Sequence, residues 1–218
     1  MLNFHLPERS GSTQNILCLG SHCDDIEIGC GGTVLHLLAR YPEARVYWVV
    51  FSSDKERAAE ARKAASLFLK GAKSSKVVVK NYRDAFFPAL GERIKENFEA
   101  LKKEFKPDVI FTHYRHDLHQ DHRLISELTW NTFRDHLILE YEIPKYDGDF
   151  GSPNLFVPLE EAVCRRKIDA VLRSFVSQRN KHWFEEQTFF AILRLRGLEC
   201  ASPTRYAEAF YCRKLVLA

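Results

Sequence analysis

Residues Asn15–Arg40 read NILCLGSHCDDIEIGCGGTVLHLLAR and decide the fold of this chain. The apolar run Asn15–Gly20 predicts a buried strand that stops at a glycine, and the apolar residues of Gly29–Arg40 recur at helical spacing. A strand, a polar loop and a helix in this order begin a β-α-β unit. The stretch therefore predicts an α/β protein.

Three further strand and helix pairs follow along the chain. The sequence predicts strands at Arg45–Phe51, Lys76–Lys80 and Pro107–His113, and helices at Asp54–Lys70, Gly91–Phe105 and from about Asp121. Such alternation indicates a mostly parallel sheet with helices on both faces.

The last third of the chain is less regular. Helices are expected at Glu160–Gln178 and Thr188–Arg196 and a strand at Tyr206–Leu217, after a long loop at Tyr141–Pro158. Long ordered loops tend to build functional sites, so we expect a role in binding for this loop; the alternative is a solvated connector.

The composition narrows the class of protein. The 218 residues are 45% hydrophobic and 28% charged, which is typical of a globular chain, and no apolar run approaches the roughly 20 residues that span a bilayer. Residues 1–14 lack the apolar stretch of a secretory signal, so we expect a cytoplasmic protein. Six cysteines without a C-x-x-C pair predict reduced thiols rather than a disulfide framework.

The net charge indicates which class of partner the protein binds. A net charge of +3 from 32 basic and 29 acidic residues argues against a nucleic-acid partner. The expected partner is a small molecule, and the sequence leaves the oligomeric state open, a homo-oligomer included.

An imidazole and two carboxylates follow the first predicted strand: His22, Asp24 and Asp25. Ligands of open α/β sheets bind beyond the carboxyl ends of the strands. A single acidic residue here would be an ordinary helix cap, but two adjacent carboxylates repel one another when buried unless a cation accompanies them. The motif therefore predicts a metal.

A second polar cluster follows the fourth predicted strand. Residues His113–His122 hold four histidines and two aspartates. One histidine alone is more often structural than a ligand, but both loops reach the same edge of the sheet. We expect His22 and Asp25 to meet His122 around a metal that keeps a coordination position open for water, as in catalytic zinc sites.

The glycines of Gly29–Thr33 allow a second interpretation, since a glycine-rich helix start can cradle phosphate. The spacing departs from G-x-G-x-x-G, and Asp24 and Asp25 would repel a pyrophosphate. Close packing of the helix is the favoured explanation.

These motifs resemble the PIG-L/LmbE family of zinc-dependent de-N-acetylases. The family pattern His-Pro-Asp-Asp, then Gly-x-Gly-Gly, is similar to His22–Asp25 and Gly29–Gly32, and the family's His-x-Asp-His matches His119–His122. Further similarity runs through the chain to Tyr206–Phe210. The chain departs from the pattern at Cys23, where proline is common, and at Ile26, where glutamate is common.

The resemblance implies a Rossmann-like single domain over residues 1–218, with a mostly parallel β-sheet flanked by helices. It implies one zinc ion per chain, with iron(II) as the alternative metal. The implied ligands are His22, Asp25 and His122, with Asp24 as general base and His119 supported by Asp121 at the oxyanion. Expected substrate contacts are Arg57, Asp84 and, from the long loop, Lys145.

The implied reaction removes acetyl from an N-acetylated amino sugar of the N-acetylglucosamine type. Two alternatives stay open: a zinc amidohydrolase acting on another small N-acyl substrate, and a non-catalytic, metal-dependent sugar-binding module.

Overall fold

The computed structural model describes residues 5–6 and 14–216. Seven strands of the described chain form one sheet in the order β3-β2-β1-β4-β5-β7-β6. The strands are β1 (Asn15–Gly20), β2 (Arg45–Ser52), β3 (Ser74–Tyr82), β4 (Val109–His113), β5 (Leu137–Tyr141), β6 (Leu155–Leu159) and β7 (Tyr206–Cys212). The helices are α1 (Asp25–Arg40), α2 (Lys55–Phe68), α3 (Gly91–Glu104), α4 (Gln120–Thr132), α5 (Glu161–Ser174) and α6 (Glu186–Glu199).

The sheet is parallel from β3 through β5, and β7 runs antiparallel to both β5 and β6. This confirms the expected α/β class with a mostly parallel sheet. The strand order reverses between β1 and β4, which makes the carboxyl ends of these two strands a topological switch point. The two histidine-bearing motifs begin there.

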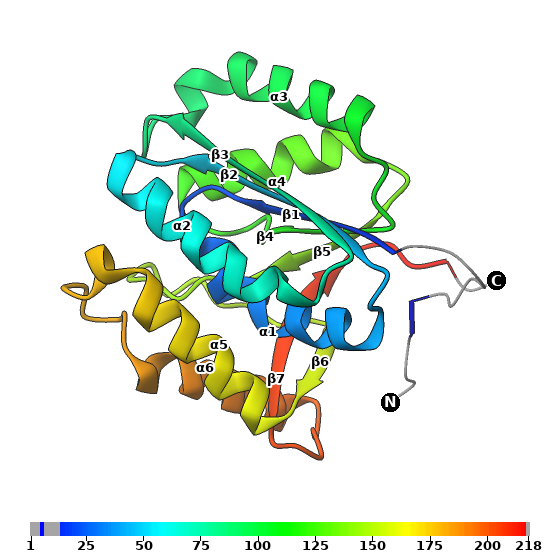
Figure 1. Ribbon diagram of the computed structural model, residues 1–218, viewed down its shortest axis with the longest axis vertical. Coiled ribbons are helices and arrows are strands. Elements are labelled where there is room, and N and C mark those ends of the chain that lie inside the picture. Colours follow the sequence, from blue (N-terminus) through cyan, green and yellow to red (C-terminus); the bar gives the residue numbers. More distant parts are fainter. Residues whose placement is uncertain (1–4, 7–13, 217–218) are drawn as a thin grey trace.

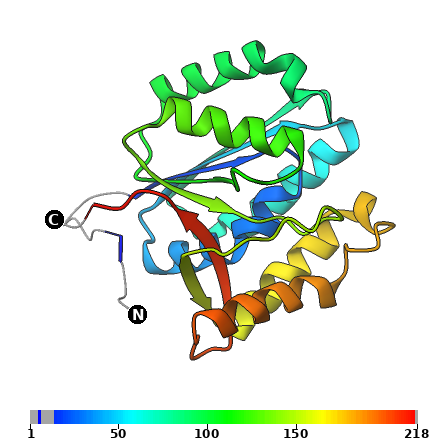
Figure 2. The ribbon, with the colours of Figure 1, turned by 180° about the vertical axis from the view of Figure 1, so that it is seen from behind.

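Helices cover both faces of the sheet. Helices α3 and α4 lie on one face, and α1, α2 and α5 lie on the other, with α6 beside α5 and β7 (Figures 1 and 2). Alternate residues of the strands supply the two cores: Ile16 and Cys18 of β1 pack toward α1, whereas Leu17 and Leu19 pack toward α3 and α4. Among the described residues, no helix is long and apolar enough to cross a membrane.

The glycines of α1 allow close packing, as expected. A Cβ at Gly29 would lie 2.2 Å from the ring of Tyr141, and one at Gly32 would lie 2.5 Å from Leu159. Both contacts are too short for any other residue. Helix α1 therefore lies directly against β5 and β6, and it begins at Asp25 rather than at Gly29 as the spacing predicted.

The predicted loop Tyr141–Pro158 was too long. Tyr141 ends β5, which the sequence did not predict, and Leu155–Leu159 forms β6, so the loop spans only residues 142–154. Pro158 indicated a loop, but β6 is an edge strand, where a missing backbone N–H is tolerated. The predicted strand Tyr206–Leu217 ends at Cys212, and Leu217 lies outside the described residues.

Candidate metal centre

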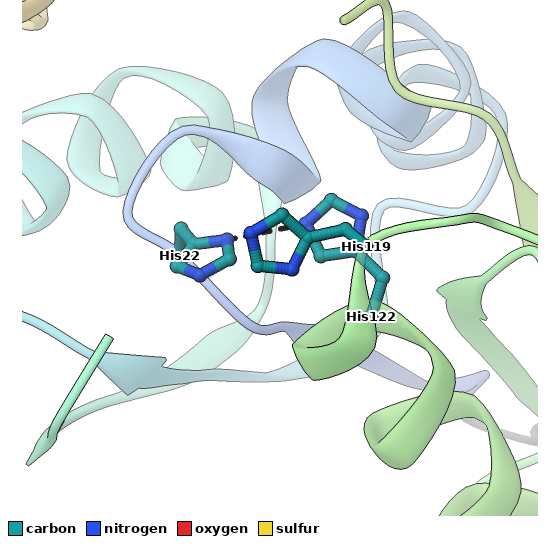
Figure 3. A group of neighbouring side chains, drawn as sticks. All are labelled: His22, His119 and His122. Carbon is teal, nitrogen blue, oxygen red and sulfur yellow. Dashed lines mark hydrogen bonds between the residues drawn. The ribbon is translucent and has the colours of Figure 1, made fainter. Parts of the chain in front are cut away.

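Three side chains from the two motifs converge at the switch point: His22 from the loop after β1, Asp25 from the start of α1 and His122 from the first turn of α4. His22 Nδ1 lies 3.1 Å from His122 Nε2 (Figure 3). Asp25 Oδ2 lies 3.4 Å from His22 Nδ1, and Asp25 Oδ1 lies 3.6 Å from His122 Nε2. Ligands at zinc's usual bond lengths of about 2.0–2.1 Å, in a tetrahedron, stand about 3.3 Å apart. The three distances lie near that separation, and the two contacts of Asp25 use different carboxylate oxygens. The triangle of these three side chains therefore has about the size that a tetrahedral zinc ion requires.

The charges at this triangle favour a cation. Burial lowers the pKa of His22, but Asp25 and hydrogen bonds to Asp121, Asp25 and Asp84 outweigh it and raise that pKa well above its usual value. Burial and then repulsion from His113 lower the pKa of His122 to about 3. Burial alone would raise the pKa of Asp25, but the surrounding imidazoles hold it well below its usual range. In the metal-free chain the protonated His22 supplies positive charge beside the buried Asp25 carboxylate, and a divalent ion that displaces this proton would supply it instead.

Carboxylates hold the far nitrogen of each imidazole. His22 Nε2 lies 2.9 Å from Asp84 Oδ1, and His122 Nδ1 lies 2.9 Å from Asp117 Oδ2. Such a partner fixes the tautomer and leaves the other nitrogen free for a metal. Sequence reasoning missed Asp117, although its place inside the histidine-rich run was a usable signal.

The carboxylate of Asp121 does not bind the His119 ring, in contrast to the expectation that it supports His119. Its buried carboxylate accepts hydrogen bonds from Ala85 N (2.7 Å) and Phe87 N (3.1 Å), and it lies 3.4 Å from His22 Nε2. Its contact with His119 is through the backbone, since Asp121 N donates to His119 Nδ1 at 3.2 Å. The reason is that a fully buried carboxylate needs several donors, and the loop before Phe87 supplies them.

His119 lies beside the triangle. Its ring centroid is 4.8 Å from that of His22 and 4.6 Å from that of His122 (Figure 3). Burial and then repulsion from His22 lower its pKa, so the imidazole is neutral at pH 7. With Nδ1 accepting from the backbone, the hydrogen of the neutral ring sits on Nε2. That nitrogen can donate to an oxyanion. His119 also lies close enough to His22 and His122 for the three rings to form a metal-binding group, but as a ligand it would have to give up this hydrogen or its bond from Asp121 N.

His113 forms another close group with Asp25 and His122. Its Nε2 lies 3.2 Å from Asp25 Oδ2 but also accepts a hydrogen bond from Ser21 N at 2.9 Å. Because that bond uses the lone pair, His113 is less suited to bind a metal than His22 or His122.

The remaining predicted residues surround this centre. Asp24 Oδ1 accepts from Arg57 Nη2 at 2.8 Å, so the guanidinium of Arg57 binds Asp24. Asp84 contacts His22, yet its side chain is 65% exposed and open to solvent.

Lys145 is not the free polar contact that we expected. Its side chain is 11% exposed, and its ammonium binds the carboxylates of Asp117 and Asp149. A buried ammonium requires such partners, which leaves it little freedom to bind a sugar hydroxyl.

The fold and these side chains define an α/β protein with a candidate divalent-metal centre at the switch point of its sheet. The family model described as GlcNAc-PI de-N-acetylase matches residues 17–133, more than half of the chain. The chain therefore belongs to the PIG-L family.

Solved structures share the fold. The conserved protein TT1542 of Thermus thermophilus has a TM-score of 0.75 at 20% identity, covering 94% of this chain and 97% of its own. The N,N'-diacetylchitobiose deacetylase of Pyrococcus horikoshii has a TM-score of 0.72 at 22% identity, covering 96% and 87%. GalB, the 4-carboxy-2-hydroxymuconate hydratase of Pseudomonas putida, has a TM-score of 0.72 at 16% identity, covering 94% and 98%. At these identities the similarity establishes the fold only. Proteins described as a deacetylase and as a hydratase share this fold, so the fold does not determine the reaction.

Proposed function

We propose that residues 1–218 form a zinc-dependent N-deacetylase that removes acetyl from an N-acetylated amino sugar. The observation that carries the proposal is the buried group of His22, His122 and Asp25, whose facing nitrogen and carboxylate oxygen atoms lie 3.1–3.6 Å apart, with both Asp25 oxygens taking part. The family description and the Pyrococcus deacetylase support an acetylated sugar as the substrate.

The proposal gives each residue a role. His22, Asp25 and His122 would hold the zinc, which when bound polarises the acetamide carbonyl and lowers the pKa of water. Asp24 accepts a proton from the water whose oxygen attacks the carbonyl carbon. Arg57 fixes Oδ1 of Asp24 during this step.

The protein also supports the later steps. The Nε2–H of His119 donates a hydrogen bond to the carbonyl oxygen as that oxygen becomes negative. The proton held by Asp24 then passes to the amide nitrogen, the C–N bond breaks, and acetate and a free amine leave. Asp84, exposed beside His22, is the proposed contact for a sugar hydroxyl.

Two other functions use the same centre. An amidohydrolase for another acyl group would need the same residues, and release of acetate distinguishes the two. A sugar-binding module would need neither Asp24 nor the hydrogen-bonding face of His119.

The test is mass spectrometry of acetamido sugars incubated with zinc-loaded protein, with loss of one acetyl group as the expected result. Asp24→Asn should keep its zinc and lose about 10²–10⁴ in rate, because it removes the general base. Asp25→Asn should lose zinc affinity, with activity partly restored by excess zinc. Full activity in Asp24→Asn would exclude the general-base role, and a fully zinc-loaded protein inert toward the whole panel would exclude the deacetylase.

A further inference from the structure

The loop of residues 142–154 reaches the metal centre through a buried group of charges, the Lys145 cluster, formed by Lys145, Asp117 and Asp149. Lys145 Nζ lies 2.9 Å from Asp117 Oδ2 and 2.6 Å from Asp149 Oδ1. The Asp117 and Asp149 side chains are 1% and 8% exposed. Two buried carboxylates therefore share one ammonium.

Asp117 and Asp149 also hold the second histidine motif. Asp117 Oδ1 accepts from His119 N at 2.7 Å, while Oδ2 accepts from His122 Nδ1 at 2.9 Å. Asp149 Oδ2 accepts from Leu118 N at 2.7 Å. The backbone before α4 and the ring of His122 thus depend on the two carboxylates that Lys145 holds together.

The loop has separate anchors away from the metal centre. Gly151 N donates to Glu142 Oε1 at 3.0 Å, Arg196 Nη2 donates to Gly151 O at 3.2 Å, and Tyr211 OH donates to Glu142 Oε1 at 2.6 Å. These contacts, which do not involve His22, Asp25 or His122, hold Lys145 in place from the far side of the loop.

We propose that Lys145 is a positioning residue that fixes the His122 ring for metal binding, an inference that rests on the proposed zinc site. Without its ammonium, Asp117 and Asp149 would repel one another in a buried space. Asp117 would move away from Asp149 and carry the bound ring of His122 with it. Loss of a partner that orients a metal ligand typically weakens metal binding about 10- to 100-fold.

The experiment compares Lys145→Met with Lys145→Arg, which keeps the charge, and with Lys73→Met, which removes an exposed lysine paired with Glu43. The readouts are the zinc dissociation constant by chelator competition and the visible spectrum of the cobalt-substituted protein. We expect Lys145→Met to bind zinc about 10-fold more weakly with an altered cobalt spectrum. Lys145→Arg should lie closer to the wild type, and Lys73→Met should match it.

A folded Lys145→Met variant with wild-type zinc affinity and cobalt spectrum would overturn the inference. Lys145 would then only stabilise the packing of the loop. If Lys145→Met fails to fold, Lys145→Met/Asp149→Asn removes one of the two repelling carboxylates and still lacks the donor to Asp117. Weakened zinc binding in that variant supports the inference, and wild-type binding overturns it. Neither readout uses a sugar, so a wild type that binds zinc but releases no acetate would overturn the deacetylase proposal alone.

Discussion

Helix α1 contacts two buried groups of charges of opposite character. Along its middle, Lys167 Nζ donates to Glu208 Oε1 and to Ile28 O, both at 2.6 Å. Glu208 also accepts from Gly32 N at 2.8 Å and Thr33 N at 2.6 Å. This pair is balanced in charge and well supplied with hydrogen bonds.

The group at the start of α1 is unbalanced. The carboxylates of Asp25, Asp84 and Asp121 surround His22, whose pKa rises well above its usual value despite burial. The difference teaches that burial of charge does not by itself mark a functional site. A balanced pair such as Lys167 and Glu208 supports structure, whereas an excess of carboxylates and imidazole lone pairs around one point indicates a site for a cation.

The largest expected effect is on zinc binding and activity, and it distinguishes the roles of two histidines at the unbalanced group, His119 and His122. His122→Ala should lose zinc and fall to background activity, because it removes a proposed ligand. His119→Ala should keep zinc and lose about 10²–10³ in kcat, because it removes an oxyanion donor. Metal analysis and steady-state kinetics check both variants. Loss of zinc from His119→Ala with retention in His122→Ala would exchange the two roles.

Breaking the balanced pair should lower stability without changing the candidate metal centre. Lys167→Met leaves Glu208 buried without its cation, which we expect to cost about 3–5 kcal/mol in the free energy of unfolding. Urea unfolding measures this cost, and zinc titration of the folded protein should stay within a few-fold of the wild type. The control is Lys167→Met/Glu208→Gln, which should recover part of the loss. A strong, selective loss of zinc affinity in Lys167→Met would contradict the separation of the two groups.

The smallest expected effect concerns Glu27, a buried carboxyl between the two groups. Burial and then repulsion from Asp24 and Asp25 raise its pKa well above 4.5, while a backbone hydrogen bond opposes this. Its neutral form favours the folded state, so its contribution to stability is complete below about pH 4.5 and is lost as the pH rises through the folded-state pKa.

Glu27→Gln stays neutral at every pH, so it should flatten the fall in stability above pH 4.5 and be more stable than the wild type at neutral pH. Urea unfolding of chelator-treated protein across this range is the measurement, with the exposed Glu96→Gln as control. An unchanged pH slope in Glu27→Gln would show that Glu27 is ionised in the folded chain.

Much of the candidate site could be predicted from the sequence, because its residues follow directly after two strands of one parallel sheet. His22, Asp25 and His122 do converge there, and their roles as ligands stay predictions for the metal experiments. The supporting residues were predicted less well. The carboxylate of Asp121 binds the backbone N–H groups of Ala85 and Phe87 rather than the His119 ring. Lys145, expected as a substrate contact, binds Asp117.

The sequence by itself determined the alternation of strands and helices and the close packing of α1, since hydrophobic periodicity and glycine positions are local signals. Only the tertiary structure decided which charges meet. Lys145 and Asp117 are 28 residues apart, and Lys167 and Glu208 are 41 apart. No local pattern connects such residues, because their pairing depends on how the loops and helices pack on the finished sheet. That packing gives Glu208 its balancing cation and makes the group around His22 the candidate site for a metal ion.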